Sequence, residues 1–208
     1  MELLQFKDIV SKLEQWSAER KLDMDKQRSG IIGNLLEEVT EFSRANNEIE
    51  KIDALSDILV FLINVMDKKD IDKYNTCTIN IPYVNPLCSL LHLINKYIIC
   101  HISIMEMIKS VITIIEQHKY NAYLCLIETI KEISSRTGSW DDNIKKFIKD
   151  KGLYKEDIEK MGDGNIVYED DETIIFNNNG DEVRYKRCIN DINTVSYTHL
   201  RAHETLAN

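Results

Sequence analysis

The segment Ile52–Met66 is the feature of the sequence that most restricts how the chain can fold. Apolar residues occur on nearly every side of it and no Gly or Pro interrupts it, which predicts a buried helix. The segment nevertheless carries Asp53 and Asp57, and no Lys or Arg lies between Ala54 and Met66. A buried carboxylate is costly without a positive partner. The fold therefore has to supply a compensating charge beside this helix.

A second acidic group precedes this helix, in the stretch Leu35–Phe42. Glu37, Glu38 and Glu41 share one face if the stretch is helical, because successive residues turn by about 100°. The short connection that follows predicts that the two helices pack antiparallel, so that four or five carboxylates converge. Like charges at close range repel and raise the pKa of each carboxyl. A divalent cation with oxygen ligands, Mg²⁺ or Mn²⁺, relieves that repulsion; the alternative is a solvated acidic helix face.

These residues resemble a known family. The pattern EExxE, followed after a short interval by ExxD, is typical of the MazG-like all-α nucleoside triphosphate pyrophosphohydrolases, in phage and bacterial forms. Glu37, Glu38 and Glu41 match the first half, and Asp57 matches the closing Asp. The departure is Ala54, where the family has Glu; Asp53 lies one residue earlier. The resemblance covers roughly residues 4–150.

The resemblance implies a metal-dependent enzyme that hydrolyses (deoxy)nucleoside triphosphates to the monophosphate and pyrophosphate. It implies Mg²⁺, with Mn²⁺ as a second possibility, held by Glu38, Glu41, Asp57 and Asp53. Glu37 and Glu38 are the expected catalytic residues, with Glu37 as a ligand, a supporting group or the base that activates water. The expected assembly is a homodimer or a dimer of dimers.

The expected triphosphate contacts follow the last helix. The segment around Arg136, Lys146 and Lys149 resembles phage-type members of the family at this point. Arginine offers a bidentate fork to phosphate and lysine a point charge. We therefore expect these three side chains to bind the substrate.

Two other functions stay open. The first is a helical module that binds a nucleotide or a protein partner without turnover, because Ala54 has weakened the metal site. The second is a hydrolase of nucleotide diphosphates or modified nucleotides.

The periodicity predicts an all-α helical bundle with a small β-meander appended near the C-terminus. The expected helices are residues 3–20, 25–45, 49–67, 85–101, 103–117 and 120–135, and the expected strands are 166–168, 173–176 and 182–185. Residues 68–86 hold both prolines and are expected to form a loop. The predicted divisions are a helical catalytic domain (1–160), the appendage (161–194) and a tail (195–208). From Val195 the tail resembles translated sequencing-adapter read-through, and we expect it not to be native.

Charge and composition narrow the class of protein. The net charge of −9 and the isoelectric point near 5.1 argue against a nucleic-acid-binding surface. The five cysteines show no metal-type spacing, and the beginning of the chain lacks the apolar run of a signal peptide. The apolar stretch Ile98–Ile115 is interrupted by His101, Glu106 and Lys109, so it predicts core helix and not a membrane span. We expect a cytoplasmic protein.

Overall fold

The structure is a computed structural model of the chain. It describes residues 1–79, 85–100, 102–134, 138–149, 166–169, 173–178 and 181–186. The chain divides into two compact units, with the boundary between Ile127 and Glu128. This boundary lies inside the last helix. The division that the sequence predicts at residue 160 falls outside the described residues and stays a prediction. The tail after Val195 lies outside the described residues.

The described part of the chain is mostly helical, as the periodicity predicts. Its α-helices are α1 (Leu3–Glu19), α2 (Met24–Arg44), α3 (Glu48–Val65), α4 (Pro86–Cys100), α5 (Ile104–Gln117) and α6 (Ala122–Ser134). A short 3-10 helix, η1 (Lys68–Lys73), occupies the beginning of the segment that the sequence predicted as loop. None of the described helices is long and apolar enough to cross a membrane.

Side-chain caps define where three of these helices begin. The carboxylate of Asp23 accepts a hydrogen bond from the backbone N–H of Lys26 at 2.8 Å. Asn47 caps α3 in the same way through Glu50, and Ser103 caps α5. Each cap satisfies a backbone donor that has no partner within its helix. The break between α2 and α3 is therefore encoded locally, and it lets α3 fold back along α2.

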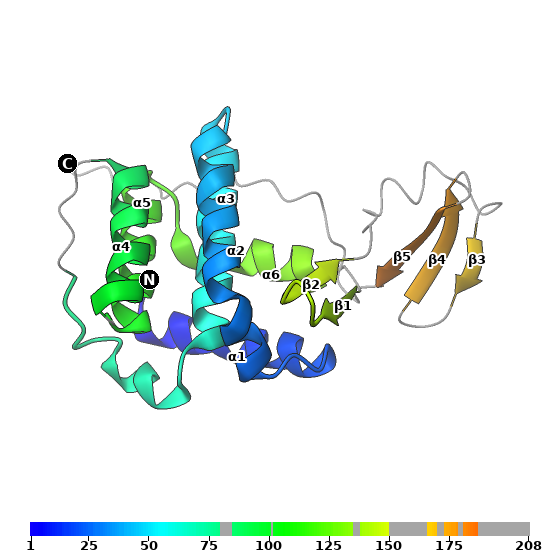
Figure 1. Cartoon of the computed structure of the whole chain (residues 1–208), viewed down its shortest axis with the longest axis horizontal. Coiled ribbons are helices and arrows are strands. Elements are labelled where there is room, and N and C mark those ends of the chain that lie inside the picture. The colour runs from blue at the N-terminus through cyan, green and yellow to red at the C-terminus, as the bar shows by residue number, and fades with distance from the viewer. Residues whose placement is uncertain are drawn as a thin grey trace, which may run out of the picture. The chain divides into compact units, whose positions relative to one another are not determined.

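Helices α2, α3, α5 and α4 form a closed set of neighbours. α2 contacts α3, α3 contacts α5, α5 contacts α4, and α4 contacts α2, while α1 packs against α3. Figure 1 shows α2 beside α3 and α4 beside α5, with α1 running across them. The core consists of apolar side chains from all of these helices, and α3 buries residues on almost all of its faces. α3 is thus the helix around which the first unit is packed.

Arg28 stabilises the antiparallel pairing of α2 and α3 at the end where α2 begins and α3 finishes, which we call the open end. The guanidinium Nε and Nη2 donate to the carbonyl oxygen of Val65 at 3.2 and 3.1 Å, and Nη2 donates to Asp67 Oδ1 at 3.0 Å. The hydrogen bond from Arg28, with a smaller contribution from Lys69, holds the pKa of Asp67 below its ordinary value. A cation at the C-terminus of α3 also suits the helix dipole.

A second set of polar interactions joins the end of α5 to the beginning of α3. His118 Nδ1 lies 2.6 Å from Glu48 Oε2, and Lys51 Nζ lies 2.7 Å from Glu48 Oε1. The hydrogen bonds from Lys51 and His118 hold the pKa of Glu48 below its ordinary value of 4.5. The side chains of His118 and Glu48 are both partly exposed to solvent, so this ion pair contributes less than about 1 kcal/mol to the free energy of unfolding.

The second unit contains β-structure of two kinds. β1 (Gly138–Asp141) and β2 (Lys146–Lys149) form an antiparallel hairpin. β3 (Ile166–Glu169), β4 (Thr173–Asn178) and β5 (Asp181–Lys186) form an antiparallel sheet in the order β3-β4-β5, at the positions where alternating residues predicted strands. The hairpin was missed, because its strands are four residues each and too short for a clear alternation.

Truncation of a core side chain in α3 should cost much of the stability of the first unit. Leu59 is fully buried, and Leu59→Ala is expected to lower the free energy of unfolding by about 2–5 kcal/mol because it leaves a cavity. Urea denaturation followed by circular dichroism measures the change. Leu4 is 78% exposed, and Leu4→Ala should change the stability by less than about 0.5 kcal/mol. Equal effects of the two substitutions would contradict this description of the core.

The Glu48 interactions predict a pH dependence of stability. The folded-state pKa of Glu48 is lowered, so its stabilising contribution is complete above the ordinary pKa and is lost as pH falls through the folded value. The difference in unfolding free energy between wild type and Glu48→Gln should therefore be larger at pH 6 than below the ordinary pKa of 4.5, and it should shrink as the pH falls further. Urea titrations in both pH ranges measure it. A difference that stays constant with pH would be inconsistent with an ionised Glu48.

Candidate functional site

The three glutamates of α2 lie in different surroundings. Glu38 belongs to the buried face of the helix and is only 7% exposed, whereas Glu37 and Glu41 are exposed. One carboxylate of the EExxE stretch therefore reaches into the helical packing, and two remain at the solvent boundary.

The acidic residues of α3 are also divided. Asp57 is half-buried and Asp53 is exposed. Ala54 is 2% exposed, so the position where the resembling family carries a glutamate points into the packed interior and offers no oxygen. Asp53 lies one residue away, which on a helix turns it by about 100° from Ala54.

The structure brings the two acidic helices together but does not gather their five carboxylates. Within the described ranges, no group of three or more His, Cys, Asp or Glu side chains is placed to hold a metal ion. The donors fit Mg²⁺ in kind, since carboxylate oxygens are its preferred protein ligands. Glu38 is buried and Asp57 is half-buried, and they lie on the two packed helices. Glu41 and Asp53 would have to turn inward from solvent to complete the set.

The basic residues expected at the triphosphate belong to the second unit. Lys146 is half-exposed at the start of β2, where it pairs in register with Asp141. Lys149 ends the same strand, opposite Gly138. Arg136 lies outside the described residues. The two lysines are therefore the first and the last residue of β2.

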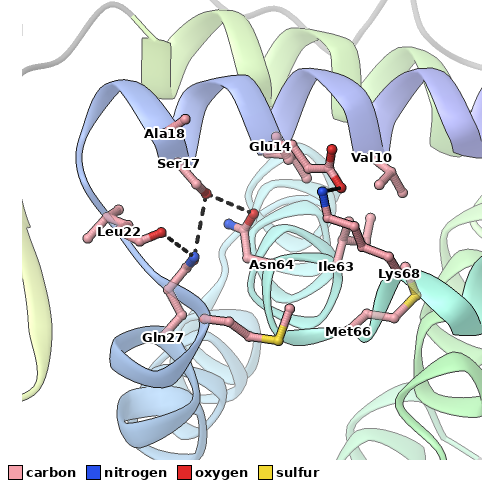
Figure 2. Close-up of a pocket in the computed structure, with 12 residues that line it drawn as sticks. Val10, Glu14, Ser17, Ala18, Leu22, Gln27, Ile63, Asn64, Met66 and Lys68 are labelled. Atoms are coloured by element: carbon pink, nitrogen blue, oxygen red, sulfur yellow. Dashed lines mark hydrogen bonds and ion pairs between the residues drawn. The ribbon is translucent and has the colours of Figure 1, made fainter.

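A pocket of about 220 Å³ opens between α1, the beginning of α2 and the end of α3. Apolar side chains make most of its wall, with Val10, Leu13 and Ile63 among them. Figure 2 shows Ser17, Gln27 and Asn64 meeting at one side of this pocket and the Glu14–Lys68 ion pair at another. The two charges of that pair are 2.8 Å apart. An apolar pocket with a few converging polar groups is the usual form of a small-molecule site.

The polar groups of the pocket form a short chain of hydrogen bonds. Gln27 Nε2 donates to the Leu22 carbonyl oxygen at 3.4 Å and to Ser17 Oγ at 3.5 Å. Ser17 Oγ donates in turn to Asn64 Oδ1 at 3.3 Å. All three distances are near the long limit for hydrogen bonds. The chain is therefore weak, and its members can exchange these bonds for bonds to a ligand at small cost.

The residues of this pocket do not stand out in the amino-acid sequence as candidates for binding. One signal was present: Asn64 is a polar residue in the otherwise apolar run from Ile58 to Met66. Ser17 and Gln27 gave no signal, because single polar residues in amphipathic helices are ordinary. Only the folding of α1 over the open end of the α2–α3 pair brings the three together.

Comparison of the chain with models of protein families, with curated proteins and with solved structures found no match.

The burial of Ala54 predicts how a glutamate would behave at that position. Ala54→Glu places a carboxylate in the packed interior one helical turn from Asp57, and it should lower the melting temperature in the absence of divalent cations, because a buried charge is desolvated. Mg²⁺ should restore part of the loss, since a cation bound only by the folded state stabilises it. Differential scanning calorimetry with and without Mg²⁺ measures both effects. Ala54→Gln is the control of similar volume; an equal response to Mg²⁺ in the two variants would show that the carboxylate is not near a cation site.

Proposed function

We propose that the protein is a metal-dependent hydrolase that converts (deoxy)nucleoside triphosphates to the monophosphate and pyrophosphate, as the MazG-like resemblance implies. The observation that carries the proposal is the burial of Glu38 on the face of α2 that packs in the bundle, with Asp57 half-buried on the adjacent α3. Buried ionisable side chains are more frequent at functional sites than elsewhere in a protein. Carboxylate oxygens are the protein ligands that Mg²⁺ prefers.

In the proposed reaction, Glu38 and Asp57 would hold Mg²⁺ from the two helices, and Glu41 and Asp53 would complete its ligands from the solvent side. A cation bound there would supply positive charge that neutralises the phosphate oxygens and favours in-line attack by water. Glu37, on the exposed side of α2, is the candidate base that takes the proton of that water. Because the reaction cleaves between the α and β phosphates, the leaving group is pyrophosphate.

The MazG-like resemblance also implies contacts between the triphosphate and three basic residues. We propose these contacts for Arg136, Lys146 and Lys149, the arginine by a fork and the lysines by charge. We further propose a homodimer or a dimer of dimers as the working assembly. The protein is acidic, with a net charge of −9, so a polyanionic substrate depends on such local positive charge to approach.

A second candidate function is a module that binds a nucleotide without hydrolysing it. Two observations favour it: Ala54 removes one oxygen ligand from the interior, and the described carboxylates do not form a group of three suited to a metal ion. Such a module keeps the pocket and the helical packing but binds the cation too weakly for turnover.

Pyrophosphate release separates these functions. The wild-type protein should release pyrophosphate and monophosphate from at least one of the common nucleoside or deoxynucleoside triphosphates, and only when Mg²⁺ or Mn²⁺ is present. Glu38→Gln should lower kcat by about 100-fold or more, because the buried ligand keeps its shape and loses its charge, while the far-ultraviolet circular dichroism stays unchanged. Asp72→Asn changes an exposed acid in η1 and should leave kcat unaltered. Full activity of Glu38→Gln would refute the site, and nucleotide binding without turnover in wild type would favour the module.

A further inference from the structure

The hydrogen bonds in the pocket of Figure 2 assign donor and acceptor atoms to two amide side chains. A carbonyl oxygen can only accept, so the atom of Gln27 that faces the Leu22 carbonyl is the donor Nε2. Ser17 Oγ accepts from the same nitrogen and donates its hydrogen to Asn64 Oδ1. Among the described residues, Gln27 Oε1 and Asn64 Nδ2 take part in no hydrogen bond. One acceptor and one donor therefore remain free at one side of an apolar pocket.

That pair of groups matches the edge of a nucleobase. Each common base is a flat ring that displays donors and acceptors side by side on its edge. A donor on such an edge would face Gln27 Oε1, and an acceptor would face Asn64 Nδ2. The ring faces would lie against the apolar wall, which Leu13 and Ile63 help to form. Side-chain amides are well suited to this role, since each carries a donor and an acceptor in one plane.

The pocket also lies on the same helix faces as the candidate carboxylates. Asn64 follows Asp57 by seven residues, which brings it back to the same face of α3 about 10 Å further along the axis. Gln27 precedes Glu38 by eleven residues, and this spacing returns to the same face of α2 about 16 Å away. A molecule with a ring at one end and phosphates at the other can thus occupy the pocket and reach toward the carboxylates along one side of the helix pair.

We propose that the pocket between α1, α2 and α3 is the site of the nucleobase, read by Gln27 Oε1 and Asn64 Nδ2. The inference rests on the proposed function for the direction in which the phosphates extend, but the recognition of the base rests on the pocket alone. Ser17 lies between the two amides and contacts both, with its Oγ 3.5 Å from Gln27 Nε2 and 3.3 Å from Asn64 Oδ1.

Binding of nucleosides tests the pocket without phosphate or metal. Adenosine, guanosine, cytidine, uridine and thymidine are titrated into the full-length protein to millimolar concentration, and amide chemical shifts are followed by NMR. At least one nucleoside should bind saturably. Asn64→Leu and Gln27→Met should each weaken that binding about tenfold, because each leaves a polar group of the base without a partner. Gln15 is an exposed amide on α1, and Gln15→Met should bind as wild type does.

Failure of the pocket and failure of the hydrolase are distinguishable. If no nucleoside binds, or if Asn64→Leu and Gln27→Met bind as tightly as Gln15→Met, the base site is wrong even where triphosphates are hydrolysed. If nucleosides bind and the two variants weaken them, the base site holds even where no pyrophosphate is released.

Turnover gives a second readout if the protein is active. Asn64→Leu should raise KM for the triphosphate about tenfold with a smaller change in kcat, because it removes a contact to a group that does not react. Inhibition by inorganic triphosphate, which has no base, should be the same in Asn64→Leu and wild type. A loss of that inhibition equal to the rise in KM would show that the substitution acts on the phosphate site and would overturn the assignment.

Discussion

The burial of α3 is the constraint on which the first unit depends. Its apolar residues face in almost every direction, so no single neighbour can cover them. α2, α5 and α1 all pack against it. A helix covered on this scale has little free surface for polar groups, and each one that it carries is held in a defined place. Asp57 and Asn64 are two such groups: Asp57 is one of the candidate carboxylates, and Asn64 lines the pocket.

The helical part of the fold could be read from the sequence because its signals are local and long. Apolar spacing located each helix to within a few residues, and alternation located the three strands of the β3–β5 sheet. The β1–β2 hairpin could not be read in this way. Its strands are four residues long, and its turn depends on Asp141, whose carboxylate accepts hydrogen bonds from the backbone N–H groups of Asn143 and Ile144. The division of the chain inside α6 was also hidden, since nothing in the composition changes there.

The candidate site could be read only in part. Helical spacing correctly placed the glutamates of α2 and the aspartates of α3 on two packed helices, but it does not say how deeply each side chain sits. Glu38 is buried while Glu41, three residues later, is exposed, because the width of the packed stripe is set by neighbouring helices and not by α2 itself. The pocket could not be predicted from the sequence for the same reason. Its polar groups come from three helices, and their meeting depends on the angle at which α1 crosses.

The hydrogen bonds of Arg28 have a consequence for any ligand that spans the site. Arg28 ties the beginning of α2 to the last carbonyl of α3 and to Asp67, and these contacts oppose sliding of one helix along the other. The pocket and the candidate carboxylates lie on these same helices, so the contacts of Arg28 also help to set the distance between them. If one ligand occupies both places, as we propose, the site would select that ligand by its length as well as by its chemistry.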